Sequence, residues 1–169
     1  MNLASAFAAS AQKRPDKIAL YWGEREFTYA KLLKQSCAVA AQLAGQYHVK
    51  AGDRVALWLK NRPEFVPALF GILNAKAVVV PINNFLKPAE VNYILQDAGI
   101  DVLITDEELA VHSPALTAAR PDLEVCKVED FAGGDDPHFT PTLSPPSEGA
   151  ERESAFGANQ SADSPEGTS

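Results

Sequence analysis

The sequence predicts an α/β fold: a doubly wound, mainly parallel sheet with flanking helices, followed by a disordered tail. In residues 1–131, segments with helical apolar periodicity alternate with short runs rich in β-branched residues. Such alternation is typical of parallel strands joined by crossover helices that pack on the sheet. A change of composition near residue 131 predicts the tail. We therefore divide the chain into an α/β unit, residues 1–131, and a tail, residues 132–169.

The first predicted elements are a short helix and a β-hairpin. Leu3, Phe7 and Ala11 recur one helical turn apart in residues 1–13. Residues 17–29, KIALYWGEREFTY, place a glycine-containing turn between two short strands. This part of the chain therefore begins with a helix and continues as two antiparallel strands.

A longer helix and a buried strand follow the hairpin. Thr28 is the predicted N-cap, because its hydroxyl accepts a free backbone N–H at a helix start. The apolar face of this helix comprises Leu32, Leu33, Val39, Ala40, Leu43 and Tyr47. After a turn at KAGD, residues 54–61 read RVALWLKN, and the uninterrupted apolar centre predicts a strand buried on both faces.

Prolines limit the next helix and strand. Residues 65–73 are apolar nearly all round a helix, and they contain Pro67. Proline lacks an N–H and is tolerated only in the first turn, so the helix should begin near Glu64 or kink at Pro67. Residues 77–83, AVVVPIN, predict a buried strand closed by Pro81.

The last elements complete the alternation. Residues 87–99 predict a helix, because Pro88 and Gly99 show the usual asymmetry of helix ends. Its apolar stripe comprises Val91, Ile94, Leu95 and Ala98. The remaining predictions are a strand, a weak helix interrupted by Pro114, and a last strand: residues 100–105, 107–119 and 123–128. No internal repeat is present.

The acidity of the chain is concentrated in the tail. Residues 1–131 hold 14 Lys+Arg and 15 Asp+Glu, a net charge of −1, whereas residues 132–169 hold one Arg and seven Asp+Glu, a net charge of −6. The tail has no Val, Ile, Met, Trp or Tyr and is rich in Pro, Gly and Ser. It cannot bury enough apolar area to offset its ordering entropy, so it is predicted to be disordered. Without a motif, an inert tail is favoured over an interaction segment.

Composition also excludes several classes of protein. A net charge of −7 is unlike that of nucleic-acid binders, which carry basic patches. No apolar run approaches the roughly 18 residues of a membrane span, and the N-terminus does not resemble a signal peptide. Cys37 and Cys126 form neither a disulfide framework nor a metal-ligand spacing. We expect a cytoplasmic protein with reduced thiols and no nucleic-acid partner.

Residue chemistry alone names no catalytic, cofactor-binding or metal-binding residue. No Gly-x-Gly-x-x-Gly follows a predicted strand, and no Walker phosphate loop is present. His48, His112 and His138 are isolated, and His48 is interpreted as a surface residue after a helix. Ser36 and Cys37 lie within a predicted helix with no evident base, which argues against a nucleophile.

An acidic neighbourhood has two interpretations. It comprises Asp97, Asp101, Asp106, Glu107 and Glu108. Asp106 follows a predicted strand, and α/β proteins place their sites at the carboxyl ends of strands. The favoured alternative is a helix N-terminus, where acids interact well with the helix dipole. The aromatic residues Phe85 and Tyr93 are interpreted as core or rim residues rather than as ligand-stacking groups.

Several blocks in order resemble the N-terminal part of the AMP-forming acyl-CoA synthetases of the acyl-adenylate-forming superfamily. They are FTYAKLLKQSCAVAAQLA in residues 27–44, and VKAGDRVALWLKNRPEFVPALFGILNAKAVVVPINNFLKPAEVNYILQDAGIDVLI in residues 49–104. Each block alone is a packing pattern, but their order and spacing are specific. The resemblance covers about residues 1–130 and is nearest to bacterial fatty-acid–CoA ligases, although related adenylating enzymes share the blocks.

The resemblance implies a reaction but also a missing part. The family activates a carboxylic acid with ATP and Mg²⁺ to an acyl-adenylate, then transfers the acyl group to CoA. The family's phosphate loop, its Thr-Glu pair, its ribose-binding Asp and its C-terminal Lys have no counterpart in this sequence. The closing SPEGTS lacks Pro-Lys-Gly, so none of these residues is assigned here.

We therefore expect a partial N-terminal α/β subdomain, truncated before the ATP-binding motif and inactive alone. Its tail is expected to depart from the family near residue 140, as a premature stop after a frame shift would cause. The alternative is a non-catalytic binding or regulatory module that pairs with a full-length synthetase. The order of the blocks argues against a third alternative, an unrelated small α/β domain. Exposed apolar surface on such a partial sheet predicts self-association.

Lys76 departs from the resemblance at one backbone joint. Related synthetases usually have Ala-Gly-Ala where this chain has Ala-Lys-Ala, between the helix of residues 65–73 and the strand that follows. Glycine suits a helix end because it takes the left-handed conformation without steric cost. We predict that Lys76 takes this conformation at a cost of about 1–2 kcal/mol. A cation near a helix C-terminus recovers about 0.3–1 kcal/mol of this cost.

Overall fold

The computed structural model describes residues 2–131. The tail predicted over residues 132–169, with its predicted disorder and with His138, lies outside the described residues. The described elements are, in chain order, α1 (Leu3–Lys13), β1 (Ile18–Trp22), β2 (Arg25–Thr28), α2 (Tyr29–Gly45), β3 (Arg54–Trp58), α3 (Phe65–Asn74), β4 (Val78–Pro81), α4 (Pro88–Asp97), β5 (Val102–Thr105), α5 (Glu107–Ala110), α6 (Ser113–Ala119), β6 (Glu124–Lys127) and the short 3₁₀ helix η1 (Val128–Asp130).

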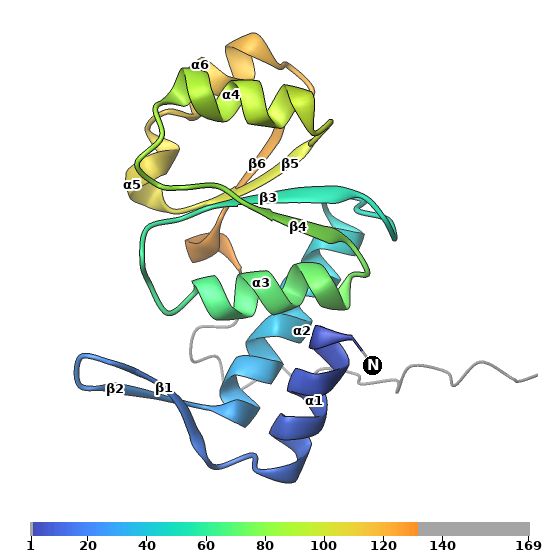
Figure 1. The fold of residues 1–169 in the computed structure, drawn as a ribbon, viewed down its shortest axis with the longest axis vertical. Coiled ribbons are helices and arrows are strands. Elements are labelled where there is room, and N and C mark those ends of the chain that lie inside the picture. Colours follow the sequence, from blue (N-terminus) through green and yellow to red (C-terminus); the bar gives the residue numbers. More distant parts are fainter. Residues whose placement is uncertain (1, 132–169) are drawn as a thin grey trace, which may run out of the picture.

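A four-stranded parallel sheet in the order β4-β3-β5-β6 organises the chain. Figure 1 shows the sheet nearly edge-on, with α4 and α6 on one side of it and α2 and α3 on the other. The antiparallel hairpin of β1 and β2 lies beside α1 and α2 as a separate two-stranded sheet. The predicted doubly wound α/β architecture is confirmed.

The central strand β3 is buried on both faces, as its apolar run predicts. Val55 and Leu57 belong to the core under α2 and α3, which includes Ile72 of α3. Ala56 and Trp58 belong to the core under α4, α5 and α6. Successive side chains of a strand point to opposite faces, so one short strand supplies both cores.

Local capping signals place the helix starts as predicted. The Thr28 hydroxyl accepts a hydrogen bond from the Lys31 backbone N–H at 3.1 Å and caps α2. Glu64 precedes α3, which places Pro67 in the first turn, where its missing N–H costs nothing. Pro88 is the first residue of α4, and Pro114 lies in the first turn of α6. The predicted weak helix is therefore two helices.

Lys76 has the predicted left-handed conformation, with φ = 61°. The N–H of Ala77 donates to the Ile72 carbonyl at 3.1 Å, and the N–H of Lys76 donates to the Leu73 carbonyl at 3.1 Å. These two bonds form a Schellman motif, which satisfies carbonyl groups at the C-terminus of α3. The side chains of Ala77 and Ile72 pack in the same core. A motif that normally selects glycine therefore contains a lysine here.

One prediction about burial was wrong. β4 is an edge strand rather than a buried one, and Val78 is 48% exposed. Leu3 is 61% exposed, and Ala4 shares the buried face of α1 with Phe7 and Ala11. Phe85 and Tyr93 are 90% and 69% exposed, so of the two alternatives, core or rim, they are not core residues. Helical and strand periodicity identify an apolar face but not whether another element covers it. Tyr47 lies beyond the end of α2, although it still packs against the core.

Candidate functional site

In α/β folds, ligands most often bind at the carboxyl ends of the strands, which here are the ends of β3 and β5. After β3 the chain enters α3, which packs on one face of the sheet, and after β5 it enters α5 and α6, which pack on the other. Neighbouring parallel strands whose connections diverge in this way create a crevice at a topological switch point. The side chains there form what we call the switch-point cluster: Lys60, Arg62, Glu64, Asp106, Glu107, Glu108 and Glu129.

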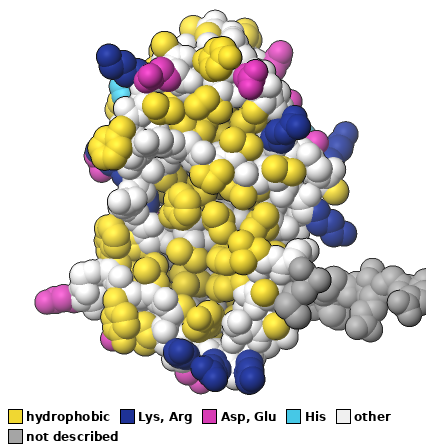
Figure 2. All heavy atoms as spheres, viewed as in Figure 1, with side chains coloured by type: hydrophobic (Ala, Val, Ile, Leu, Met, Phe, Trp, Pro, Cys, Tyr) yellow, Lys and Arg dark blue, Asp and Glu magenta, His cyan; other side chains and the backbone are white. Residues whose placement is uncertain are grey.

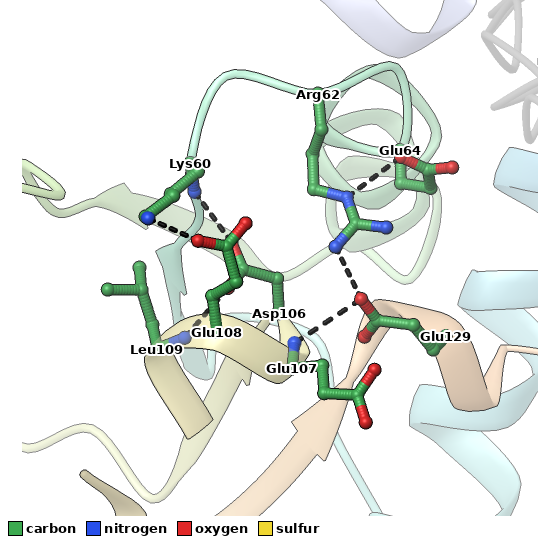
Figure 3. A network of polar contacts seen from close by, with 8 residues as sticks. All are labelled: Lys60, Arg62, Glu64, Asp106, Glu107, Glu108, Leu109 and Glu129. Carbon is green, nitrogen blue, oxygen red and sulfur yellow. Dashed lines mark hydrogen bonds and ion pairs between the residues drawn. The ribbon is translucent and has the colours of Figure 1, made fainter. Parts of the chain in front are cut away.

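Asp106 is the buried centre of the switch-point cluster. Its side chain is 1% exposed, and it caps α5 by accepting the Leu109 backbone N–H at 2.8 Å. Its other carboxylate oxygen accepts the Lys60 backbone N–H at 2.7 Å. Figure 3 shows the carboxylate between these two donors, one on α5 and one on the segment after β3. The favoured prediction of a helix N-terminal acid is confirmed, and the bond to Lys60 adds a link between two strand ends.

The cluster also contains two ion-paired cations, Lys60 and Arg62. The Lys60 ammonium group donates to Glu108, and this hydrogen bond raises the pKa of Lys60. The Arg62 guanidinium donates to Glu64 at 2.9 Å and also to Glu129. Burial alone would lower the pKa of Arg62, but the hydrogen bonds to Glu64 and Glu129 raise it on balance.

Glu129, just after β6, contacts both the segment that follows β3 and the first residue of α5. One of its oxygens accepts from Arg62 and also from the Glu107 backbone N–H at 3.3 Å. Burial alone would raise the pKa of Glu129, but hydrogen bonds from backbone N–H groups and from Arg62 lower it on balance. The cluster therefore joins the ends of β3, β5 and β6.

The groups of the switch-point cluster pair with one another and join the segments that follow β3, β5 and β6. It has two cations and five carboxylates, so its formal charge is −3. Both cations are already paired, and no hydroxyl, thiol or imidazole belongs to the cluster. A nucleotide triphosphate would meet net negative charge there. Within residues 2–131, no three His, Cys, Asp or Glu side chains are grouped so as to hold a metal ion. Within this cluster, neither cation is left unpaired for an ATP phosphate.

The other sequence candidates are not brought together. Ser36 is fully buried and donates to the Leu32 carbonyl at 2.7 Å, while burial raises the pKa of the neighbouring Cys37 thiol. The His112 ring lies 6.0 Å from the Trp58 ring, between centroids. His48 is exposed just after α2, as predicted, although its φ of 53° was not anticipated. None of these residues belongs to the switch-point cluster.

The remaining acids are spread over two other positions. Asp97 ends α4, and Asp101 forms an ion pair of 2.8 Å with Arg120. Asp101 also lines a pocket of about 320 Å³ at the opposite end of the strands, where β3 and β5 begin, together with His48 and Arg54. Arg54 there donates to the Ala98 carbonyl at 3.1 Å. These polar groups hold connections between elements.

Sequence reasoning did not identify four members of the cluster, namely Lys60, Arg62, Glu64 and Glu129. Lys60 lies inside the predicted strand, residues 54–61, and Arg62 directly follows it, whereas the observed strand β3 ends at Trp58. Their position near a strand end was therefore a usable signal. Glu108, the ion-pair partner of Lys60, lies 48 residues away from it in the sequence, and Arg62 and Glu129 lie 67 residues apart. No pattern in a single sequence identifies such pairs before the strand order is known.

Comparison with known proteins gives a consistent result. The family model described as AMP-binding enzyme matches residues 7–165. The match extends beyond residue 140, where the resemblance was expected to end. The chain is 31% identical over 151 residues to a linear gramicidin synthase from Brevibacillus parabrevis, covering 89% of this chain and 2% of that protein. It is 35% identical over 103 residues to the long-chain-fatty-acid–CoA ligase of Escherichia coli O157:H7, covering 61% and 18%.

Solved structures share the fold. The anthranilate CoA ligase AuaEII in complex with anthranoyl-AMP superposes with a TM-score of 0.71 at 30% identity, over 78% of this chain and 25% of that one. The O-succinylbenzoate coenzyme A synthetase MenE of Bacillus subtilis in complex with AMP gives 0.66 at 28% identity, over 74% and 31%. Across six curated relatives, the region that matches this chain spans between 2% and 24% of the length of the relative.

Proposed function

Because the chain belongs to the AMP-binding enzyme family, we propose that it is the N-terminal, sheet-bearing part of an AMP-forming acyl-CoA ligase. The family reaction activates a fatty or other carboxylic acid with ATP and then transfers the acyl group to CoA. The supporting observation is the match of both sequence and fold to a CoA ligase in complex with an acyl-adenylate, at 30% identity and a TM-score of 0.71. Curated fatty-acid–CoA ligases at 30–36% identity support the same substrate class.

In this proposal, the described residues supply the fold rather than the chemistry. The switch-point cluster is self-paired and net negative, so ATP, Mg²⁺ and CoA would be held by parts of an adenylate-forming enzyme other than residues 2–131. When present, ATP supplies the adenylate leaving group that makes a carboxylate reactive. The role of this chain's residues is to join the ends of β3, β5 and β6 through Asp106, Arg62 and Glu129.

The proposal includes a cytoplasmic location and a role in fatty acid metabolism. The thiols of Cys37 and Cys126 are free, which suits a reducing compartment. Among residues 2–131, no helix combines the length and apolar character needed to cross a membrane.

A graft into a relative tests the proposed function. Residues 1–131 replace the aligned region of the Escherichia coli O157:H7 long-chain-fatty-acid–CoA ligase, and pyrophosphate release is measured with ATP and a fatty acid. The graft should retain release that depends on both substrates, whereas the isolated 169-residue chain should show only background. A folded graft without activity, or an active isolated chain, would contradict the proposal.

A further inference from the structure

Three cations lie close together in the chain where α1 ends. Lys13 is the last residue of α1, Arg14 follows it, and Lys17 comes just before β1. All three residues are exposed, and within residues 2–131 none of their side chains forms an ion pair or a hydrogen bond. The dipole of α1 accounts for cations in its last turn, but Lys17 lies beyond the helix. These charges therefore have no partner among the described residues.

The same three cations line one pocket. It has a volume of about 260 Å³, and Ser10 and Tyr29 complete its lining. None of the lining residues is acidic, so the lining has a formal charge of +3, whereas residues 1–131 together carry a net charge of −1. Asp16, in the same loop, is not part of the lining. The pocket therefore concentrates positive charge on a part of the chain that is otherwise close to neutral.

Backbone hydrogen bonds fix the loop that carries Arg14 and Lys17. The Lys17 N–H donates to the Arg14 carbonyl at 3.2 Å, which closes the loop on itself. The first residues of α2 fasten the loop, because the Tyr29 N–H donates to the Lys17 carbonyl at 3.0 Å and the Ala30 N–H donates to the Pro15 carbonyl at 3.0 Å. Figure 1 shows the loop at the lower end of the molecule, beside the start of α2. Since the backbone is already held, binding of a ligand does not have to order this loop.

The charge and the size of the pocket indicate the class of ligand. Guanidinium and ammonium groups form strong, charge-assisted hydrogen bonds with phosphate oxygens, and an arginine can bind two of these oxygens at once. Three cations exceed what a single carboxylate needs, and they outweigh the roughly half negative charge at the C-terminus of α1. The volume is below the roughly 300–1,000 Å³ of pockets that hold drug-sized ligands. These properties suit a compact anion with more than one negative charge.

The pocket is separate from the switch-point cluster. No residue belongs to both, and the cluster has the opposite sign, with a formal charge of −3. Figure 2 shows several Lys and Arg side chains gathered at the lower end of the molecule, where α1 ends in Figure 1, and hydrophobic side chains across the middle of this face. An anion is therefore attracted to the end of α1 rather than to the ends of β3, β5 and β6.

We propose that this pocket, at the end of α1, is a phosphate-binding site. Its ligand carries a phosphomonoester or diphosphate group, either on a soluble molecule or as the headgroup of a membrane lipid. Arg14 binds two phosphate oxygens, and Lys13 and Lys17 neutralise the remaining negative charge. The site goes beyond the proposed ligase chemistry and does not depend on it.

Two double variants of the full chain test the site. Lys13→Gln with Lys17→Gln removes two charges from the pocket, whereas Lys34→Gln with Lys50→Gln removes two charges from exposed positions outside it. Calorimetry measures the affinity for pyrophosphate, and co-sedimentation measures binding to vesicles of phosphatidylcholine with and without phosphatidic acid. The pocket variant should bind about tenfold more weakly than the parent chain, and the control within about twofold of it. The full chain is used so that residues 132–169, with a net charge of −6, are present as a competing anion.

Arg14→Lys distinguishes a built site from a diffuse positive surface. It keeps the charge but loses the planar pair of donors, so it should weaken binding about threefold or more. Binding of pyrophosphate identifies a soluble phosphate as the ligand, and binding to phosphatidic acid vesicles alone identifies a lipid headgroup. The proposal is overturned if the full chain binds neither probe, if the two double variants bind alike, or if Arg14→Lys binds as tightly as the parent chain.

Discussion

Asp106 accepts the backbone N–H of Lys60, so a buried carboxylate after β5 holds the chain as it leaves β3. The same side chain caps α5 through the Leu109 N–H. Two segments that diverge to opposite faces of the sheet are therefore joined by one residue. The switch-point crevice is closed by a hydrogen-bonded carboxylate, which is a structural use of a position that α/β proteins often use for ligands.

The first prediction concerns this carboxylate. Asp106→Asn should lower the free energy of unfolding by about 1–3 kcal/mol, because the amide places an NH₂ group against one of two buried N–H donors. Urea denaturation measures the change. Glu108→Gln is the control, since the exposed pair of Glu108 with Lys60 should contribute less than about 1 kcal/mol. Equal effects of the two substitutions would show that Asp106 does not link the strand ends.

The second prediction concerns the left-handed lysine. Lys76→Gly should raise the free energy of unfolding by about 1 kcal/mol, because glycine takes the conformation at φ = 61° without strain. Lys76→Ala separates strain from charge: it loses the favourable dipole interaction and keeps the Cβ, so it should give no gain. The measurement is the midpoint of denaturant unfolding for the parent chain and for the two variants. A lower midpoint for the glycine variant would mean that the lysine side chain makes a stronger contact than its strain costs.

The third prediction concerns the contact of α2 with α3. A Cβ at Gly71 would overlap the Val39 side chain and lie 3.1 Å from the Ser36 carbonyl oxygen. Gly71→Ala should therefore lower stability by about 1–3 kcal/mol. Gly45→Ala, at the end of α2 with no atom in the way, should be neutral or stabilising. The double variant Val39→Ala with Gly71→Ala should recover part of the loss, and its failure to do so would place the strain elsewhere.

The fourth prediction concerns acid. The pKa of Glu129 is lowered in the folded chain from its ordinary value near 4.5. A lowered carboxyl pKa means that the unfolded chain binds the proton first, so the stabilisation from Glu129 is complete above pH 4.5 and is lost as the pH falls through the folded value. Thermal unfolding between about pH 6 and pH 3 should therefore be less pH-dependent in Glu129→Gln than in the parent chain.

The control for acid is Glu24→Gln, in the exposed turn between β1 and β2. This substitution should leave the pH profile of thermal unfolding close to that of the parent chain. If Glu129→Gln and Glu24→Gln give the same profile, the contacts of Glu129 with Arg62 and with the Glu107 N–H do not stabilise the fold.

Local features could be read from the sequence because their causes lie within a few residues. The Thr28 cap reaches a backbone N–H three residues ahead. Pro67 limits the start of α3 by its own missing N–H, and the left-handed Lys76 follows from the need to end α3 just before β4. The alternation of helical segments with short strand-like runs was also sufficient to predict the parallel sheet, since crossover helices are the usual way to join parallel strands.

The order β4-β3-β5-β6 was decided only by tertiary structure. That order places the valine-rich β4 at an edge, although its composition predicted burial. It also brings Arg62 to Glu129, 67 residues away, and the Lys60 N–H to Asp106, 46 residues away. Side-chain periodicity records which face of an element is apolar, whereas coverage of that face and pairing of distant charges depend on which strands become neighbours.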